Sequence, residues 1–102
     1  MYKIDWTLGS ELTYYKEIEY ILSKWSFDEV EKFIKLVEDK IQTLSTGTMI
    51  GKPSNIKEVR ILVISKQTSL AYKVFENQSR IELLSFWNNK VNPNDYKEYL
   101  EF

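Results

Sequence analysis

Three apolar runs between residues 58 and 93 constrain the fold more than any other part of this chain. The run Val59–Ile64 is apolar on both faces apart from Arg60, a pattern typical of an interior strand. Two further runs, Leu70–Phe75 and Ile81–Trp87, follow after short polar breaks. Breaks of this length join antiparallel neighbours, so the three runs predict a three-stranded meander.

Residues 26 to 45 predict an amphipathic helix that needs such a sheet to pack on. Ser26 with Glu29 three residues later fits a capping box, and Trp25 just before can pack on Val30 as a hydrophobic staple. The apolar side chains then recur at helical spacing in one stripe: Val30, Phe33, Ile34, Val37, Ile41 and Leu44.

The first 24 residues predict a strand followed by another helix. Residues 2 to 6 alternate, which places Tyr2, Ile4 and Trp6 on one buried face. Ser10 is the expected N-cap of a helix that runs to about residue 22. Its face toward the sheet is expected at Leu12, Tyr15, Ile18 or Glu19, and Leu22, and Trp6 and Trp25 are both expected in the core.

These elements predict one α+β domain over residues 1–102, in the order strand, helix, helix and three strands. The short Ser23-Lys24 connection makes the helices an antiparallel hairpin. One face of the sheet is the surface available to bury their apolar stripes, which gives two layers. The sheet is expected to be mainly antiparallel and four-stranded, and residues 45–55 read as a loop because they are rich in Ser, Thr and Gly.

The composition excludes several kinds of chemistry. The chain has no cysteine and no histidine, so disulfides, thiolate metal sites, cysteine nucleophiles and the usual general base are all missing. Any catalysis must use Lys, Arg, Tyr, Asp or Glu, and we expect neither metal nor organic cofactor. No apolar run is long enough for a signal peptide or a membrane span, so we expect a cytoplasmic protein with no membrane partner.

Positive charge is concentrated in the strand half of the sequence. Residues 1–46 hold six lysines against nine acidic residues, a net of −3, and residues 94–102 have a net of −2 from one lysine and three acids. Residues 47–93 hold five lysines and two arginines against three glutamates, a net of +4. This half could present a positive face to a nucleic acid or an acidic partner, or the asymmetry could arise by chance.

Several short motifs occur in a fixed order along nearly the whole chain. In the first half they are Ile4 to Thr7, Tyr20-Ile21 before Trp25-Ser26, and the stripe from Phe33 to Ile41. In the second half they are Val59 to Lys66, Leu70 to Val74, Ile81 to Leu84, Trp87 to Asn89 and Asn92-Pro93. Together with the order of elements, these motifs resemble the RelE/ParE family of toxins from type II toxin-antitoxin modules. The resemblance implies a toxin that a cognate antitoxin neutralises, in a possible homodimer or toxin-antitoxin hetero-oligomer.

The family implies two activities for such a toxin. ParE-like members resemble inhibitors of DNA gyrase, which need no catalytic group. RelE-like members resemble metal-independent nucleases that cut mRNA in the ribosome, a reaction in which cations stabilise the charge that develops on phosphate. This sequence has Ser69 where RelE-like nucleases usually carry an arginine, and its C-terminal tyrosines, Tyr96 and Tyr99, lie in an acidic tail. A third alternative is a non-toxic α+β binding module.

The candidate site residues come from the basic strand half. Those that could take part in catalysis are Arg60, Lys66, Lys73 and Arg80, and those that could bind the target are Lys57, Trp87 and Lys90. Arg60 and Lys73 could form a phosphate site if they share a sheet face. Each residue also has a structural alternative: Arg60 could pair with Glu58, Glu76 or Glu82, Trp87 could cover the core, and the lysines could be solvated surface charges.

Overall fold

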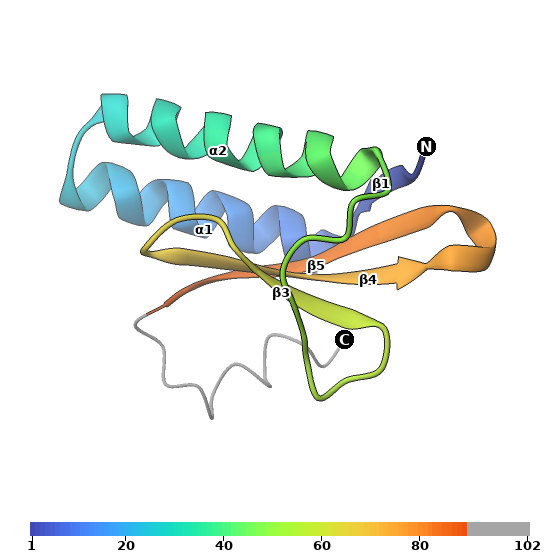
Figure 1. Cartoon of the computed structure of the whole chain (residues 1–102). Coiled ribbons are helices and arrows are strands. Elements are labelled where there is room, and N and C mark those ends of the chain that lie inside the picture. The colour runs from blue at the N-terminus through green and yellow to red at the C-terminus, as the bar shows by residue number, and fades with distance from the viewer. Residues whose placement is uncertain (90–102) are drawn as a thin grey trace.

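Two helices lie together on one face of a five-stranded sheet in the computed structural model, which describes residues 1–89 (Figure 1). The predicted α+β class, the two layers and the helical hairpin are confirmed. The elements are β1 (Lys3–Trp6), α1 (Leu8–Lys24), α2 (Phe27–Ser45), β2 (Lys52–Pro53), β3 (Val59–Val63), β4 (Thr68–Phe75), the short 3-10 helix η1 (Glu76–Gln78) and β5 (Arg80–Asn88).

The sheet has the order β1-β5-β4-β3-β2. The predicted meander of β3, β4 and β5 is antiparallel, while β1 joins β5 in parallel and makes the sheet mixed. The expected count of four strands is wrong, because β2 pairs Lys52 with Ile61 and Pro53 with Arg60 at the outer edge. A strand of two residues, one of them proline, has no alternation for sequence analysis to detect.

The main core lies between the helices and the sheet. The predicted stripe of α2 is confirmed, since Val30, Phe33, Val37 and Leu44 are buried, while Ile34 and Ile41 are half-buried against the same cluster. The strands contribute Leu62, Leu70, Tyr72, Ile81, Leu83 and Phe86 to that cluster. The other face of the sheet carries a smaller cluster of Val59, Ala71, Leu84 and Trp87.

Thr7 is the N-cap of α1, so the prediction of Ser10 is wrong by three residues. The Thr7 hydroxyl accepts a hydrogen bond from the Ser10 N–H at 3.1 Å and donates one to the carbonyl of Leu83 at 2.7 Å. Threonine and serine both cap helices well. Thr7 is the cap in place of Ser10 because its hydroxyl also ties the start of the helix to β5.

Ser26 is the N-cap of α2 as expected, but the capping box does not form. Within residues 1–89 the Ser26 side chain makes no capping hydrogen bond, and its carbonyl alone accepts from Glu29 and Val30. Trp25, expected in the core, is 47% exposed at the turn between the helices. Trp6 is half-buried and packs against the main core.

The expected apolar face of α1 is wrong for three of its four residues, and only Ile18, which is half-buried, packs against the main core. Leu12, Tyr15 and Leu22 are all more than half exposed, whereas Ser10, Glu17 and Ile21 are buried. Polar residues face the sheet because they complete its hydrogen bonds. The Thr13 hydroxyl accepts from the Phe86 N–H at 2.8 Å, close to the irregular register between β4 and β5.

Candidate functional site

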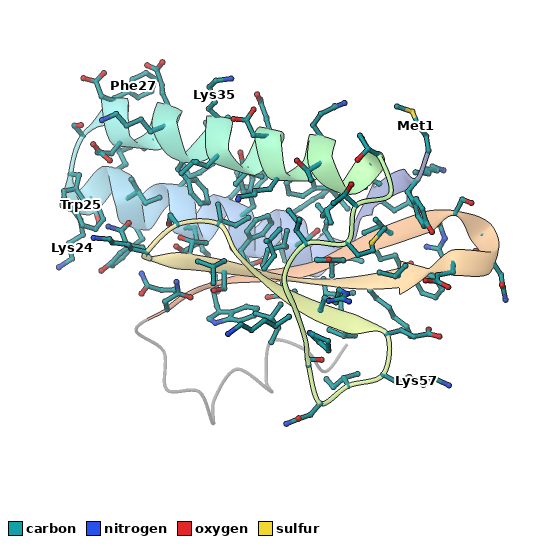
Figure 2. The ribbon with its side chains drawn as sticks, viewed as in Figure 1. Met1, Lys24, Trp25, Phe27, Lys35 and Lys57 are labelled. Carbon is teal, nitrogen blue, oxygen red and sulfur yellow. The ribbon has the colours of Figure 1, made fainter. Side chains whose placement is uncertain are left out.

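A hollow of about 660 Å³ at one end of the sheet brings two of the predicted site residues together. One wall is the loop of residues 54–58 with the start of β3, and the other is the end of β4 with η1. Lys57 and Arg60 line it from the loop side, together with Glu58, and Phe75 and Glu76 line it from the other. Figure 2 shows Lys57 on this loop, on the side of the sheet away from the helices.

Arg60 is held in the hollow by the backbone of the preceding loop. Its Nη1 donates to the Gly51 carbonyl at 3.1 Å, which accounts for one of the five guanidinium N–H donors. No residue of the range 1–89 accepts a second hydrogen bond from this half-buried guanidinium, which leaves it further donors for an anionic ligand. Of the three carboxylates considered as partners of Arg60, Glu82 pairs with Arg80 instead.

Gly51 is the residue that allows the loop to approach β3. Its φ of +100° favours glycine, and a Cβ at this position would lie 2.6 Å from the carbonyl oxygen of Ile61. The Arg60 anchor therefore depends on a residue that sequence analysis read only as part of a loop.

Tyr72 lies beside Arg60 on the helix side of the sheet and supports the same loop. Its hydroxyl donates to the Ile50 carbonyl. Burial raises the pKa of Tyr72 to about 12, although the charge of Arg60 opposes the shift. At neutral pH Tyr72 is thus a protonated hydrogen-bond donor and does not accept protons from a substrate.

Lys73 and Arg60 lie on opposite faces of the sheet, so the phosphate site expected from that pair does not form. Arg60 pairs with Tyr72 in the β3–β4 register, and Lys73 pairs with Val59. Neighbouring residues on a strand point to opposite faces. The Lys73 ammonium instead lies 5.1 Å from the centre of the Phe75 ring.

Arg80 is engaged by several partners on the face of the sheet that carries Lys73, away from the helices. Its Nη1 lies 2.6 Å from Glu82 and 3.5 Å from Asp5, and its guanidinium carbon lies 4.1 Å from the centre of the Phe75 ring. The hydrogen bond to Glu82 is the main cause that raises the pKa of Arg80 above its already high value. These contacts commit most of the side chain to the fold.

Lys66 lies at the other end of β3, in the turn before β4. Asn89 holds this turn, since its side-chain amide donates to the carbonyls of Ser65 and Lys66 at 3.2 and 3.0 Å. Ser69, at the position where the sequence resemblance led us to expect an arginine in a nuclease, is buried and donates to the Asn89 side-chain oxygen at 2.5 Å. β5 ends at Asn88, so Asn89 follows directly on the last residue of the strand.

The remaining predicted target-binding residues have different placements. Trp87 is 8% exposed and packs with Val59, Ala71 and Leu84, so its ring contributes to the smaller cluster. Lys90, with Tyr96, Tyr99 and Asn92-Pro93, lies outside the described residues. The structure thus groups Lys57 with Arg60, groups Lys73 with Arg80 around Phe75, and separates Lys66 from both.

Within residues 1–89, two other kinds of feature are absent. No group of three or more Asp or Glu side chains there is placed to hold a metal ion. No helix in the same range is long and apolar enough to cross a membrane.

Comparisons with known proteins identify the fold. No family model and no curated protein matches the sequence. A chain of the chromosomal ParDE toxin-antitoxin system from P. aeruginosa superposes with a TM-score of 0.70 at 16% identity, over 86% of this chain and 96% of that one. The isolated E. coli RelE toxin gives 0.60 at 16% identity over 98% and 96% of the two chains. A metal-bound toxin from Helicobacter pylori gives 0.66 at 11% identity over 88% and 97%.

These neighbours match nearly their whole length at low identity, so the likeness concerns the arrangement of the chain. This structural likeness agrees with the resemblance of the sequence motifs and with the order of the elements. The chain has the two-layer α+β fold of the RelE/ParE toxins.

Proposed function

We propose that this chain is the toxin of a type II toxin-antitoxin module, neutralised by a cognate antitoxin. The observation that carries the proposal is the fold likeness to the ParDE and RelE structures, over nearly the full length of every chain compared. The ordered sequence motifs that resemble the same family also support the proposal. Fold alone does not determine function, so the choice between DNA gyrase and ribosomal mRNA as the target must rest on the site residues.

The distribution of the cations favours a ParE-like toxin that arrests growth by binding DNA gyrase. A nuclease needs several cationic and proton-transferring groups around one phosphate. Here Lys66 is remote from Arg60, Arg80 is engaged by carboxylates, and Ser69 is buried against Asn89. A binding function needs none of these groups to converge.

The alternative is a RelE-like, ribosome-dependent mRNA endonuclease centred on Lys57 and Arg60. Both residues line the 660 Å³ hollow, which is open to a phosphodiester backbone. Their charges could stabilise a pentacovalent phosphate without a metal. Glu58 and Glu76 in the same lining weaken the local positive potential and so speak against this alternative.

The antitoxin is expected to cover an exposed edge of the sheet. Because β2 has two residues, β3 continues beyond it, and Val63 there is 58% exposed. A second hollow of about 510 Å³ runs along this edge and is lined by Ile61, Leu62 and Val63 with residues of the loop. An extended segment could add a strand here.

Controlled expression tests the proposal. We expect induction to arrest growth, and co-expression of the adjacent open reading frame to relieve the arrest. Purified protein should inhibit DNA supercoiling by gyrase and leave mRNA intact in toeprinting on translating ribosomes. Codon-dependent cleavage of mRNA with no inhibition of gyrase would contradict the ParE-like function and support the nuclease. Unimpaired growth at high expression would favour the non-toxic binding module.

A further inference from the structure

The outward face of α1 carries a second apolar stripe, which is separate from the face that packs on the sheet. Leu8, Leu12, Tyr15, Glu19 and Leu22 recur at intervals of four, three, four and three residues. This alternation is the one that places side chains along the seam of a coiled coil. We name these five residues the α1 seam.

The α1 seam is exposed although four of its members are large and apolar. Leu8 is 71% exposed, Leu12 55%, Tyr15 61% and Leu22 51%. At 3.6 residues per turn, the seam lies opposite the buried positions Ser10, Glu17 and Ile21. An exposed stripe on a helix with large apolar side chains at four of its five positions marks a surface that another helix covers.

We propose that a second copy of this chain covers the α1 seam, with the two α1 helices antiparallel around a two-fold axis. The seam of a coiled coil consists of the a and d positions of the heptad repeat. In the antiparallel arrangement, each layer of the seam pairs an a position of one helix with a d position of the other. Aligning the seams in this way places Leu12 against Leu22 of the second copy and Tyr15 against Glu19 of the second copy. The pairing is reciprocal, as a two-fold interface requires.

Charge selects this orientation and this occupant. Glu19 is the one charged residue among the five positions of the seam, and an unpaired carboxylate in an apolar seam is costly. The antiparallel alignment places it beside the Tyr15 hydroxyl and level with Lys16 of the second copy, which is exposed and can pair with it. A parallel dimer would place the two Glu19 carboxylates against each other.

Trp25 extends the same surface at the end of α1. It is 47% exposed, and Figure 2 shows it at the turn between the two helices. In the antiparallel dimer this end lies near Leu8 of the second copy, so the most exposed leucine of the seam gains an apolar neighbour. The resulting interface is small, in the class of transient complexes that bury less than about 1,200 Å².

Sedimentation velocity and light scattering over a wide range of protein concentrations test the proposal. We expect a monomer–dimer equilibrium that Leu12→Arg shifts toward monomer, with at least about a tenfold weaker association. The matched control is Leu36→Arg, at an exposed leucine of α2 outside the seam, which should leave association unchanged. Glu19→Leu should tighten the dimer at least several-fold, a gain that misfolding cannot produce.

Cross-linking tests the orientation, because the chain has no cysteine of its own. A mixture of Leu12→Cys and Leu22→Cys chains should oxidise to the mixed disulfide dimer, while Leu12→Cys alone should form little. Efficient self-linking of Leu12→Cys would indicate a parallel pair and overturn the proposal.

Three other results would also overturn it. One is a monomer at all concentrations with no gain from Glu19→Leu. The second is equal loss of association in Leu36→Arg. The third is a chain that is monomeric alone and loses binding to the adjacent gene product through Leu12→Arg, which would assign the α1 seam to the antitoxin.

Discussion

The hydroxyl of Thr68 donates a hydrogen bond of 2.7 Å to Glu17 Oε2 across the interface between α1 and the start of β4. Both side chains are buried, with Glu17 7% exposed and Thr68 fully buried. Burial raises the pKa of Glu17, and the hydrogen bond from Thr68 opposes that shift. The docking of α1 on the sheet therefore includes the burial of a carboxyl group.

Glu17→Gln is expected to stabilise the fold at neutral and alkaline pH. Because the folded-state pKa is raised, the stability that protonated Glu17 contributes is complete below its unfolded pKa and is lost as pH rises through its folded pKa. The amide cannot ionise, so we expect a gain of roughly 1 kcal/mol above that range and none in acid. Urea unfolding across a pH series measures the difference.

Thr68→Val provides the control for this interpretation. It keeps the shape of the side chain but removes the donor, so the ionised carboxylate loses its partner and the fold should lose about 1–3 kcal/mol at neutral pH. The loss should shrink in acid. A pH-independent gain in Glu17→Gln would show that the ionisation of Glu17 is irrelevant to stability.

Sequence analysis predicted α2 better than α1 for a physical reason. Every large apolar residue of the α2 stripe faces the core, so periodicity and burial agree. On α1 the sheet-facing side contains Thr13 and Glu17, because the strands below supply donors that need acceptors. An apolar pattern then selects the outward Leu12 and Tyr15, and the resulting prediction points to the wrong face.

Thr13→Val should destabilise the protein more than its helical position suggests. The Phe86 N–H donates to the Thr13 hydroxyl at 2.8 Å, and valine would leave that buried donor without an acceptor. We expect a loss of about 1–3 kcal/mol in the free energy of unfolding. Thr43→Val is the matched control, because among residues 1–89 the Thr43 hydroxyl bonds only within α2, to the Asp39 carbonyl. Equal losses in urea unfolding would contradict the role of the Phe86 contact.

The sequence predicted which basic residues belong to the candidate site, but it did not predict which of them lie together in the fold. Lys57 and Arg60 are close in sequence and share the hollow. The alternation of β4, by contrast, puts Lys73 on the opposite face from Arg60, and the register that fixes this depends on pairing between strands. Phe75, which gathers Lys73 and Arg80, reads in the sequence as one more apolar strand residue.

Gly51→Ala should both destabilise the fold and disturb the Arg60 anchor. The added Cβ would lie 2.6 Å from the Ile61 carbonyl oxygen, at a φ that side chains rarely adopt. We expect a loss of about 1–3 kcal/mol from the backbone conformation alone, with the steric contact adding to it. Gly47→Ala has a similar φ, but its nearest contact is the Tyr2 ring at 3.4 Å, so it should cost less. Thermal unfolding of the two variants compares them, and equal midpoints would rule out the close approach to β3.

Arg60→Ala and Arg80→Ala should separate function from stability. Arg60 lines the hollow, and within residues 1–89 its side chain donates a hydrogen bond only to the Gly51 carbonyl, so its removal should abolish growth arrest while the melting temperature changes little. Arg80 holds Glu82, Asp5 and the Phe75 ring together, so its removal should lower the melting temperature. Growth arrest by Arg80→Ala should persist at a temperature where the variant is folded. Growth assays with matched expression, together with thermal unfolding, read both effects. Full toxicity of Arg60→Ala would remove Arg60 from the functional surface, because no loss of folding could account for that result.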